Sequence, residues 1–269
     1  MADASGCVVT VGTYDGVHLG HRRLLAEAME EGRRRSLPTV VVTFDRHPTE
    51  VLRPDRAPRL LTGLDHKLEL LAATGVDEVE VLHFDLERAH ESAEDFVLGD
   101  LVGRLGARAV LVGTNFRFGH RQRGDVALLE ELASRHDFAA RGIELYIDDE
   151  TRTVVSSSVI RAHLAAGAVG EAARLLGRPH EVRGHLAAGR LALDGPLALP
   201  GSGRFPVLVG PPGGDAEPAL ATVTAPEELF LLSPAGGPLA LSGRLAVRFT
   251  GRREDEPATG AAHAAAGAS

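Results

Sequence analysis

The sequence predicts a doubly wound α/β domain followed by a small all-β domain, and two observations carry this prediction. In the first two thirds of the 269-residue chain, short runs of Val, Ile and Leu alternate with stretches of helical periodicity. Such runs are typical of parallel strands that are covered by helices on both faces. Beyond residue 180, short apolar pieces are separated by Gly and Pro, which is typical of a small antiparallel sheet or barrel.

The expected elements of the α/β part follow the chain in regular alternation. Short apolar runs rich in β-branched residues predict strands, and these runs are 7–12, 38–44, 77–84, 108–113 and 143–147. Apolar residues at helical spacing predict helices, and these stretches are 19–35, 65–75, 92–106, 124–136, 156–167 and 169–177. The pieces expected to form strands in the all-β part are 182–193, 205–214, 228–238 and 244–249.

These patterns divide the chain into three segments. Residues 1–179 are expected to form the α/β domain, and residues 180–250 the all-β domain. The last segment, 251–269, is polar and rich in small residues, so we expect it to be a disordered tail.

Composition and charge exclude several classes of protein. With 44% hydrophobic and 25% charged residues, the chain has the composition of an ordinary globular protein. A formal net charge of −8 disfavours a general binder of nucleic acid or of anionic membranes. No apolar run approaches the roughly 18 residues of a membrane-spanning helix. The single cysteine, Cys7, excludes an intrachain disulfide and fits a reducing compartment, so we expect a cytoplasmic protein.

One feature of the composition restricts how the chain could bind ATP. Lys67 is its only lysine, and neither a Walker A motif nor the strand lysine of protein kinases is present. An ATP-using protein of this composition must therefore meet the triphosphate charge with arginine, histidine, backbone N–H groups and metal.

The segment after the first expected strand, V-G-T-Y-D-G-V-H-L-G-H at 11–21, is the first candidate site. Gly12 and Gly16 permit a tight turn and a close approach of a ligand to the backbone. His18 and His21 are three residues apart at the start of a helix, where free N–H groups favour anions. Two histidines there suit a phosphate that gains negative charge during reaction. They could instead be surface polar residues or metal ligands.

This segment resembles the G-x-F-D-G-V-H-x-G-H signature of bacterial FAD synthetases, the FMN adenylyltransferase module of bifunctional riboflavin kinase/FMN adenylyltransferases. These enzymes belong to the HxGH nucleotidyltransferase superfamily. Further segments resemble family motifs in the same order, and they are T-F-D-R-H-P at 43–48, G-T-N-F-R-F-G-H-R-Q-R-G-D at 113–125, V-S-S-S-V-I-R at 155–161 and L-L-G-R-P at 175–179. The resemblance covers nearly all of 7–180 and implies a Rossmann-like fold.

The resemblance also implies a reaction. The phosphate of FMN would attack the α-phosphorus of Mg-ATP, giving FAD and pyrophosphate without a covalent enzyme intermediate. The implied catalytic residues are His18, His21, Asn115 and Arg161. The implied ATP-binding residues are Gly12, Tyr14, Asp15, Gly16, Gly20, Ser156, Ser157 and Ser158. The three serines could also serve simply as the N-cap of a helix.

The expected FMN-binding residues lie in the segments after the second and fourth strands of the sheet. They are Phe44, Arg46, His47, Pro48, Phe116 and Phe118. Phenylalanines at strand ends can instead belong to the core. Arg46 stands where the family usually has proline, and this extra cation either strengthens FMN binding or indicates a different acceptor. Mg²⁺ is inferred from the family and from phosphoryl chemistry, and no carboxylate cluster in the sequence marks a metal site.

In bifunctional members of the family, the second domain is a flavokinase barrel that binds Mg-ATP through a P-T-A-N motif and uses a later glutamate as base. The sequence after residue 180 contains no P-T-A-N. Glu228 could occupy the base position, although Glu227 and Glu228 could equally be solvated charges at a strand end. We therefore expect a degenerate kinase-like barrel without riboflavin kinase activity.

Three hypotheses of function follow. The first is an FAD synthetase that uses ATP and FMN. The second is an enzyme of the same superfamily with another phosphorylated acceptor. The third is a non-catalytic regulatory protein that binds flavin nucleotides.

Overall fold

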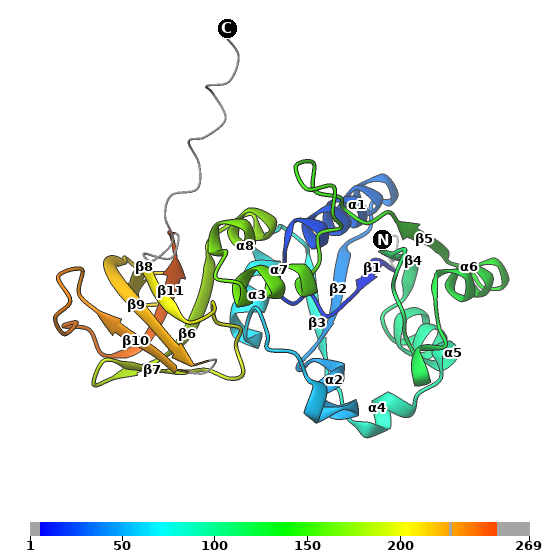
Figure 1. Ribbon diagram of the computed structural model, residues 1–269. Helices are drawn as coiled ribbons and strands as arrows, with labels where there is room; N and C mark the ends of the chain where they lie inside the picture. Colours follow the sequence, from blue (N-terminus) through cyan, green and yellow to red (C-terminus); the bar gives the residue numbers. More distant parts are fainter. Residues whose placement is uncertain (1–5, 226–227, 252–269) are drawn as a thin grey trace, which may run out of the picture. The chain divides into compact units, whose positions relative to one another are not determined.

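The computed structural model describes residues 6–225 and 228–251, and the chain divides into two compact units (Figure 1). The first unit comprises residues 1–58 and 64–157, and the second comprises residues 59–63 and 158–269. Apart from Gly251, the tail expected at 251–269 lies outside the described residues.

The first unit contains a five-stranded sheet in the order β3-β2-β1-β4-β5, with every neighbouring pair parallel. Its strands are β1 (Cys7–Val11), β2 (Thr39–Phe44), β3 (Glu78–Leu82), β4 (Ala107–Gly113) and β5 (Ala139–Ile143). Its helices are α1 (Leu19–Arg35), α2 (Pro48–Leu52), α3 (Leu64–Ala72), α4 (Leu86–His90), α5 (Ala93–Asp95), a π-helix (Phe96–Arg104) and α6 (Val126–Arg135), with short 3₁₀ turns at Pro54–Arg56 and His120–Gln122. The α/β prediction is confirmed.

Alternate residues of β1 pack against helices on opposite faces of the sheet. Val9 and Val11 are buried together with side chains of the π-helix and α6, including Phe96. Val8, whose side chain lies on the opposite face of the strand, is buried with Ala28 of α1. Because both faces are covered, the strands can be apolar along their whole length, which explains the continuous Val runs in the sequence.

The fifth strand differs from the prediction. A strand was expected at 143–147, but β5 covers Ala139–Ile143, and Ile147 makes only an isolated bridge to Val154. The alternation of apolar residues at 143–147 resembles a strand, yet pairing with β4 selects the preceding segment. The prediction of the strand's position was therefore wrong, because strand pairing outweighs the local pattern.

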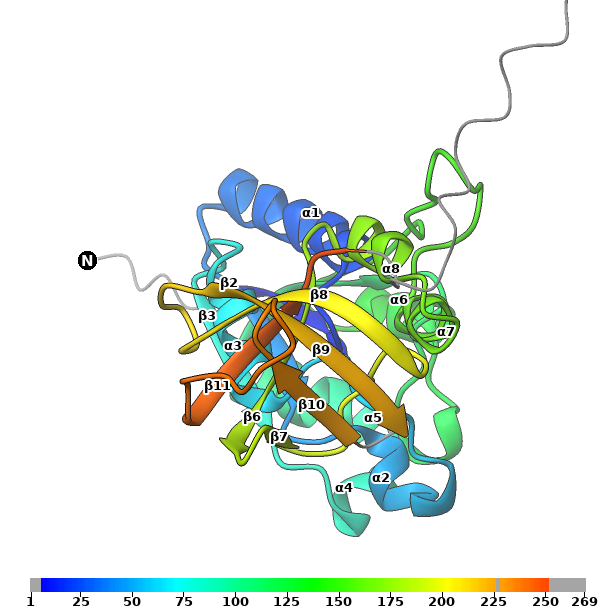
Figure 2. The same cartoon turned by 60° about the vertical axis from the view of Figure 1, so that its left-hand side comes forward.

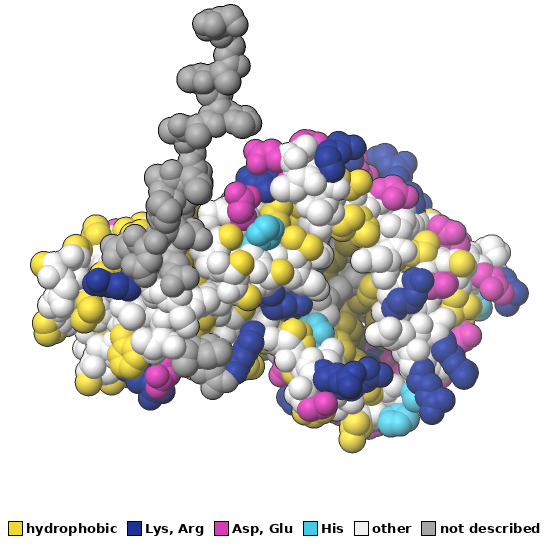
Figure 3. All heavy atoms as spheres, viewed as in Figure 1, with side chains coloured by type: hydrophobic (Ala, Val, Ile, Leu, Met, Phe, Trp, Pro, Cys, Tyr) yellow, Lys and Arg dark blue, Asp and Glu magenta, His cyan; other side chains and the backbone are white. Residues whose placement is uncertain are grey.

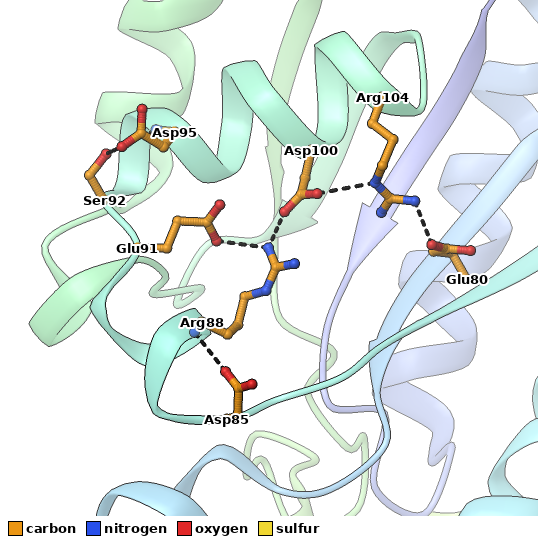
Figure 4. A network of polar contacts seen from close by, with 8 residues as sticks. All are labelled: Glu80, Asp85, Arg88, Glu91, Ser92, Asp95, Asp100 and Arg104. Atoms are coloured by element: carbon orange, nitrogen blue, oxygen red, sulfur yellow. Dashed lines mark hydrogen bonds and ion pairs between the residues drawn. The ribbon is translucent and has the colours of Figure 1, made fainter.

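A network of ion pairs holds the π-helix to its surroundings (Figure 4). The guanidinium of Arg88 in α4 contacts Asp100 of the π-helix and lies 2.8 Å from Glu91. Arg104 lies 3.1 Å from Asp100 and 2.6 Å from Glu80 of β3. The network thus joins α4, the π-helix and β3 through side chains.

Helix α1 carries a buried carboxylate near its C-terminus. Glu31 is 6% exposed and forms ion pairs with Arg34 and Arg35. Burial raises the pKa of this carboxyl, but hydrogen bonds from Arg35 and Arg34 outweigh burial, and the net shift is downward.

Acid is therefore expected to destabilise the protein partly through Glu31. A carboxyl whose pKa is lowered on folding contributes stability above its unfolded pKa of about 4.3, and this stability is lost as the pH falls through the lower, folded value. We expect Glu31→Gln to lose less unfolding free energy than the wild type between about pH 5 and pH 3, as measured by urea denaturation. Equal losses in the two proteins would contradict this assignment.

The second unit contains a closed six-stranded barrel in the order β10-β7-β6-β11-β8-β9, which Figure 2 shows from another side. Its strands are β6 (His180–Ala187), β7 (Arg190–Leu193), β8 (Gly203–Gly210), β9 (Glu217–Ala225), β10 (Glu228–Leu232) and β11 (Gly243–Phe249). The unit also includes two helices, α7 (Ser157–Ala165) and α8 (Val169–Leu176). The first residue of α7, Ser157, belongs to the first unit. The predicted all-β barrel is confirmed, and β9 is an additional strand that the sequence pattern did not reveal.

Candidate active site

The chain turns sharply after β1. Tyr14, Gly16 and Val17 have positive φ angles of 50°, 83° and 39°. Tyr14 is fully buried, its hydroxyl lies 2.8 Å from Oγ1 of Thr10, and burial raises its pKa. A Cβ at Gly12 would lie 3.1 Å from the Tyr14 ring, so a larger residue there would have to displace this buried ring by a few tenths of an ångström.

His18 and His21 lie together at the N-terminus of α1. His18 is the N-cap, and its Nδ1 accepts a hydrogen bond from the backbone N–H of His21 at 3.3 Å. The two imidazole rings are stacked, with centroids 3.6 Å apart, and the Tyr14 ring meets His21 edge-on at 5.1 Å. Because Nδ1 of His18 is an acceptor, a neutral imidazole carries its proton on Nε2. An N–H of this kind is a suitable donor to a phosphate.

The serine segment meets this turn. The hydroxyl of Ser157 donates to the carbonyl of Asp15 at 2.9 Å, across 142 positions of sequence. A Cβ at Gly20 would lie 3.1 Å from the carbonyl oxygen of Val155 and 3.2 Å from the His18 ring. Gly20 thus allows the chain before α7 to approach α1. The start of α7 is in this way fixed beside the two histidines.

The other site residues expected in this segment are Ser156, Ser158 and Arg161, and they are divided between the two units. Ser156 is half-buried in the first unit, whereas Ser158 and Arg161 belong to the second unit. Ser158 is exposed and Arg161 is half-buried. Ser157 and Arg161 are four residues apart in α7 and therefore lie on one face of that helix.

The loop after β2 is built around local hydrogen bonds. His47 is the N-cap of α2, and its Nδ1 accepts from the N–H of Thr49 at 3.2 Å. The carboxylate of Glu50 accepts from the N–H of His47 at 2.9 Å, and Pro48 is the first residue of the helix. Phe44, at the end of β2, packs edge-on against Phe84 at 5.4 Å.

Arg46 is exposed at 45% of its side chain and is paired with Asp45 at 3.2 Å. Asp45 also accepts from the N–H of Phe84 at 3.0 Å and from the His83 ring at 2.7 Å. Burial raises the pKa of Asp45, but the hydrogen bonds from Phe84, His83 and Arg46 outweigh burial and lower it. Asp45 therefore remains ionised at neutral pH and pairs with Arg46 as a carboxylate.

The loop after β4 holds the third group of predicted residues. Asn115 is exposed and Phe116 is half-buried. Phe116 stacks on Phe118 at 5.3 Å, and Phe118 in turn contacts Phe96 of the π-helix at 6.0 Å. Phe118 is 7% exposed and part of the core, so Phe116 is the more accessible of the two rings.

Sequence reasoning missed Lys67 as a residue of this region. It is 7% exposed, and its ammonium donates to the carbonyl of Phe44 at 2.7 Å, to Oγ1 of Thr43 at 3.2 Å and to the carbonyl of Thr13 at 3.3 Å. Its only signal in the sequence is that it is the sole lysine. The partners could not be inferred, because they lie far from it along the chain.

The described residues, 6–225 and 228–251, show neither a cluster of metal-ligating side chains nor a helix that could span a membrane. They contain no group of three or more His, Cys, Asp or Glu side chains that could hold a metal ion. No helix in these ranges is long and apolar enough to cross a membrane. Charged side chains of both signs are distributed over the face shown in Figure 3.

A parallel sheet whose first turn presents two stacked histidines, with Gly20 between them, at a helix N-terminus defines an α/β protein of the HxGH type. The sequence model of the FAD synthetase family matches residues 1–159, and the chain belongs to this family. The predicted family is confirmed.

The curated relatives carry a two-part name. The bifunctional riboflavin kinase/FMN adenylyltransferase of Escherichia coli (strain K12) is 38% identical over 189 residues, which are 70% of this chain and 60% of the relative. The protein of the same name from Pseudomonas fluorescens is 36% identical over 185 residues, 69% of this chain and 58% of the relative. The matched part of this chain thus spans about 60% of the length of these relatives.

Among solved structures, a protein described as a macrolide-efflux protein from Streptococcus pneumoniae has a similar fold. The TM-score is 0.78 at 25% sequence identity, covering 96% of this chain and 89% of that one.

Proposed function

We propose that the protein is an FMN adenylyltransferase that transfers AMP from Mg-ATP to FMN, giving FAD and pyrophosphate. The observation that carries this proposal is the stacked pair His18/His21 at the N-terminus of α1, in the turn after β1. Membership of the FAD synthetase family supports it.

The chemistry required matches what these side chains offer. An oxygen of the FMN phosphate attacks the α-phosphorus of ATP, the bond from that phosphorus to the bridging oxygen breaks, and pyrophosphate leaves with the electron pair. Negative charge grows on the phosphate oxygens, and N–H donors at a helix N-terminus stabilise it. We assign this role to the imidazoles of His18 and His21, with Asn115 and Arg161 as further polar contacts. Mg²⁺ would enter with ATP, since it is held largely by phosphates and water in such sites.

The test is direct. The purified full chain is incubated with Mg-ATP and FMN, and FAD and pyrophosphate are followed by chromatography. We expect both products in equal amounts. Tight binding of FMN or FAD without pyrophosphate release would contradict the proposal and favour a regulatory binding protein. The single buried thiol, Cys7, suits a reducing compartment, and we propose a cytoplasmic site of action.

We further propose that the barrel is not a riboflavin kinase. The segment after β7 is committed to packing, since 197–200 is buried. Ala198 donates its N–H to the carbonyl of Leu60 at 2.8 Å, and its own carbonyl lies 2.8 Å from Nε2 of His180. Leu60 donates to the carbonyl of Pro196 at 2.8 Å. These backbone groups are therefore engaged within the unit rather than available to a nucleotide.

The candidate base is also engaged. Glu228 begins β10 and lies 3.4 Å from the guanidinium of Arg190, with 44% of its side chain exposed. This fits the interpretation of Glu228 as a solvated strand-end charge. Glu227 lies outside the described residues. We expect riboflavin and Mg-ATP to give no FMN under conditions in which FMN gives FAD, and formation of FMN would contradict this.

Arg46 favours one alternative, an acceptor other than FMN. Its exposed guanidinium adds a positive charge to the loop assigned to FMN. If FMN is the acceptor, Arg46→Gln is expected to raise the KM for FMN about fivefold, corresponding to about 1 kcal/mol for one exposed charge contact, and to leave the KM for ATP unchanged. To test the alternative, kcat/KM is measured for a panel of phosphorylated acceptors. An acceptor other than FMN is supported if the kcat/KM of another compound clearly exceeds that of FMN.

A further inference from the structure

Lys67 is a buried cation without a charged partner among its hydrogen-bond acceptors. It extends from α3 and donates to two carbonyls and a hydroxyl, those of Thr13, Phe44 and Thr43. Burying an ammonium costs free energy unless its protons are well satisfied, so such an arrangement calls for an explanation.

Two opposing effects act on the pKa of the Lys67 ammonium group. Burial lowers the pKa of Lys67 to about 8, while the negative charges of Asp15, Asp45 and Glu50 act in the opposite direction. Asp15 and Asp45 belong to the loops that follow β1 and β2, and Glu50 lies in the first turn of α2. The cation therefore lies within the electrostatic field of both loops.

The three acceptors lie where β1 and β2 separate. The parallel pairing of these strands ends at Val11 and Val42. It is followed by a hydrogen bond from the N–H of Gly12 to the carbonyl of Val42 at 3.1 Å and by one from the hydroxyl of Thr43 to the carbonyl of Thr13 at 3.2 Å. Beyond that point, the ammonium group of Lys67 joins Thr13, after β1, to Thr43 and Phe44 at the end of β2. In open α/β sheets the ligand binds outside the carboxyl ends of the strands, next to the point where the strand order reverses, which here lies between β1 and β4.

The residues that Lys67 contacts lie at the starts of two loops. The loop after β1 is the one assigned to ATP (the ATP loop), and the loop after β2 is the one assigned to FMN (the FMN loop). Thr13 directly precedes Tyr14, whose ring meets His21. Phe44 directly precedes the loop that contains Arg46 and His47. The ammonium group of Lys67 thus adds to the direct Thr43–Thr13 hydrogen bond in fixing the starting points of the ATP loop and the FMN loop relative to each other.

We propose that Lys67 is a positioning residue, which sets the spacing between the ATP and FMN loops by joining Thr13 to Thr43 and Phe44. This inference rests on the proposed function and extends it. Because the reaction requires two phosphates in line, a displacement of about 1 Å between the loops can cost about 10²-fold in rate.

The experiment compares three variants of the full chain with the wild type. Lys67→Met removes the donors at similar length, Lys67→Arg retains a charged donor, and Leu70→Met changes another residue of α3 conservatively. We expect Lys67→Met to lose about 10²-fold in kcat/KM, with raised KM for both substrates, Lys67→Arg to lose less, and Leu70→Met to behave as wild type. Melting temperatures are measured alongside.

The kinetic outcomes separate the possibilities. A folded Lys67→Met protein with wild-type kcat and KM overturns the role of Lys67. Absence of FAD from the wild type overturns the proposed function instead, and Lys67 is then judged by calorimetric ATP binding to wild type and Lys67→Met, where equal affinities would overturn its role.

If Lys67→Met does not fold, a second measurement on the wild type tests whether Lys67 responds to the substrates. Since the chain has one lysine, protein grown with isotope-labelled lysine gives a single side-chain NMR signal. We expect this signal to shift, and its titration midpoint to move to higher pH, when ATP or FMN is added, because both bring negative charge to the loops. A signal that is unchanged at saturation with both compounds overturns the proposal.

Discussion

Replacing His18 by asparagine is expected to lower kcat for FAD formation by about 10²-fold or more while the protein remains folded. The imidazole serves two purposes here, since its Nδ1 caps α1 and we assign its Nε2 as the donor to the reacting phosphates. Asparagine is a good N-cap and therefore preserves the first purpose while removing the second. Steady-state kinetics and thermal melting of the same preparation measure the two separately.

His18→Ala is the matched control, because it removes both purposes. It is expected to show the same loss of rate together with a loss of about 1 kcal/mol in unfolding free energy, the cost of an absent cap. His21→Ala and Arg161→Ala are expected to show comparable losses of rate without unfolding. Wild-type turnover in His18→Asn would refute the assignment of the histidines to the reacting phosphates.

The largest effect on stability is expected from Gly119→Ala. Gly119 has a φ of +69°, and a Cβ there would lie 2.5 Å from the Cα of Ala93 in α5. An alanine must therefore strain its own backbone and displace a neighbouring one, at a cost of about 2–4 kcal/mol. The displacement would move the loop that carries Phe116, so the KM for FMN should rise as well. Urea denaturation and kinetics measure the two effects.

Gly99→Ala provides the comparison. Gly99 lies in the π-helix, is exposed, and a Cβ there would meet nothing within 4 Å. We expect this variant to be as stable as the wild type or slightly more stable, because alanine is a better helix former than glycine. If the two variants lose equal stability, the clash at Gly119 is not the cause.

The elements that the sequence predicted well are those in which local pattern and tertiary packing agree. Helix α1 has the predicted bounds, Leu19–Arg35, because its N-cap, its apolar stripe and its basic last turn all point to the same segment. In β5 the two disagree, since Ala139, Ala140 and Gly142 are poor strand formers that are drawn into the sheet by pairing with β4. Strand β9 was missed for a different reason. It pairs with β8 and β10, its neighbours along the chain, but Pro218 and three alanines make its segment a weak strand pattern.

The candidate site shows the same division. The histidine turn could be predicted because glycines, histidines and a helix start lie within eleven consecutive residues. The contact of Ser157 with Asp15 and the place of Lys67 could not be predicted, because they depend on separations of 142 and 54 residues. The assigned roles of Asn115, Phe116 and Arg161 stay predictions, and Arg161→Ala tests the last of them.

Amine-directed reagents would find one lysine side chain in this protein, and it is buried. Acylation of Lys67 requires that the ends of β1 and β2 open and release its three hydrogen bonds. When opening and closing are fast compared with the chemistry, the rate of modification reports the population of the open form. A mass increase at this one position would therefore give the free energy of opening of the sheet edge, without an introduced label.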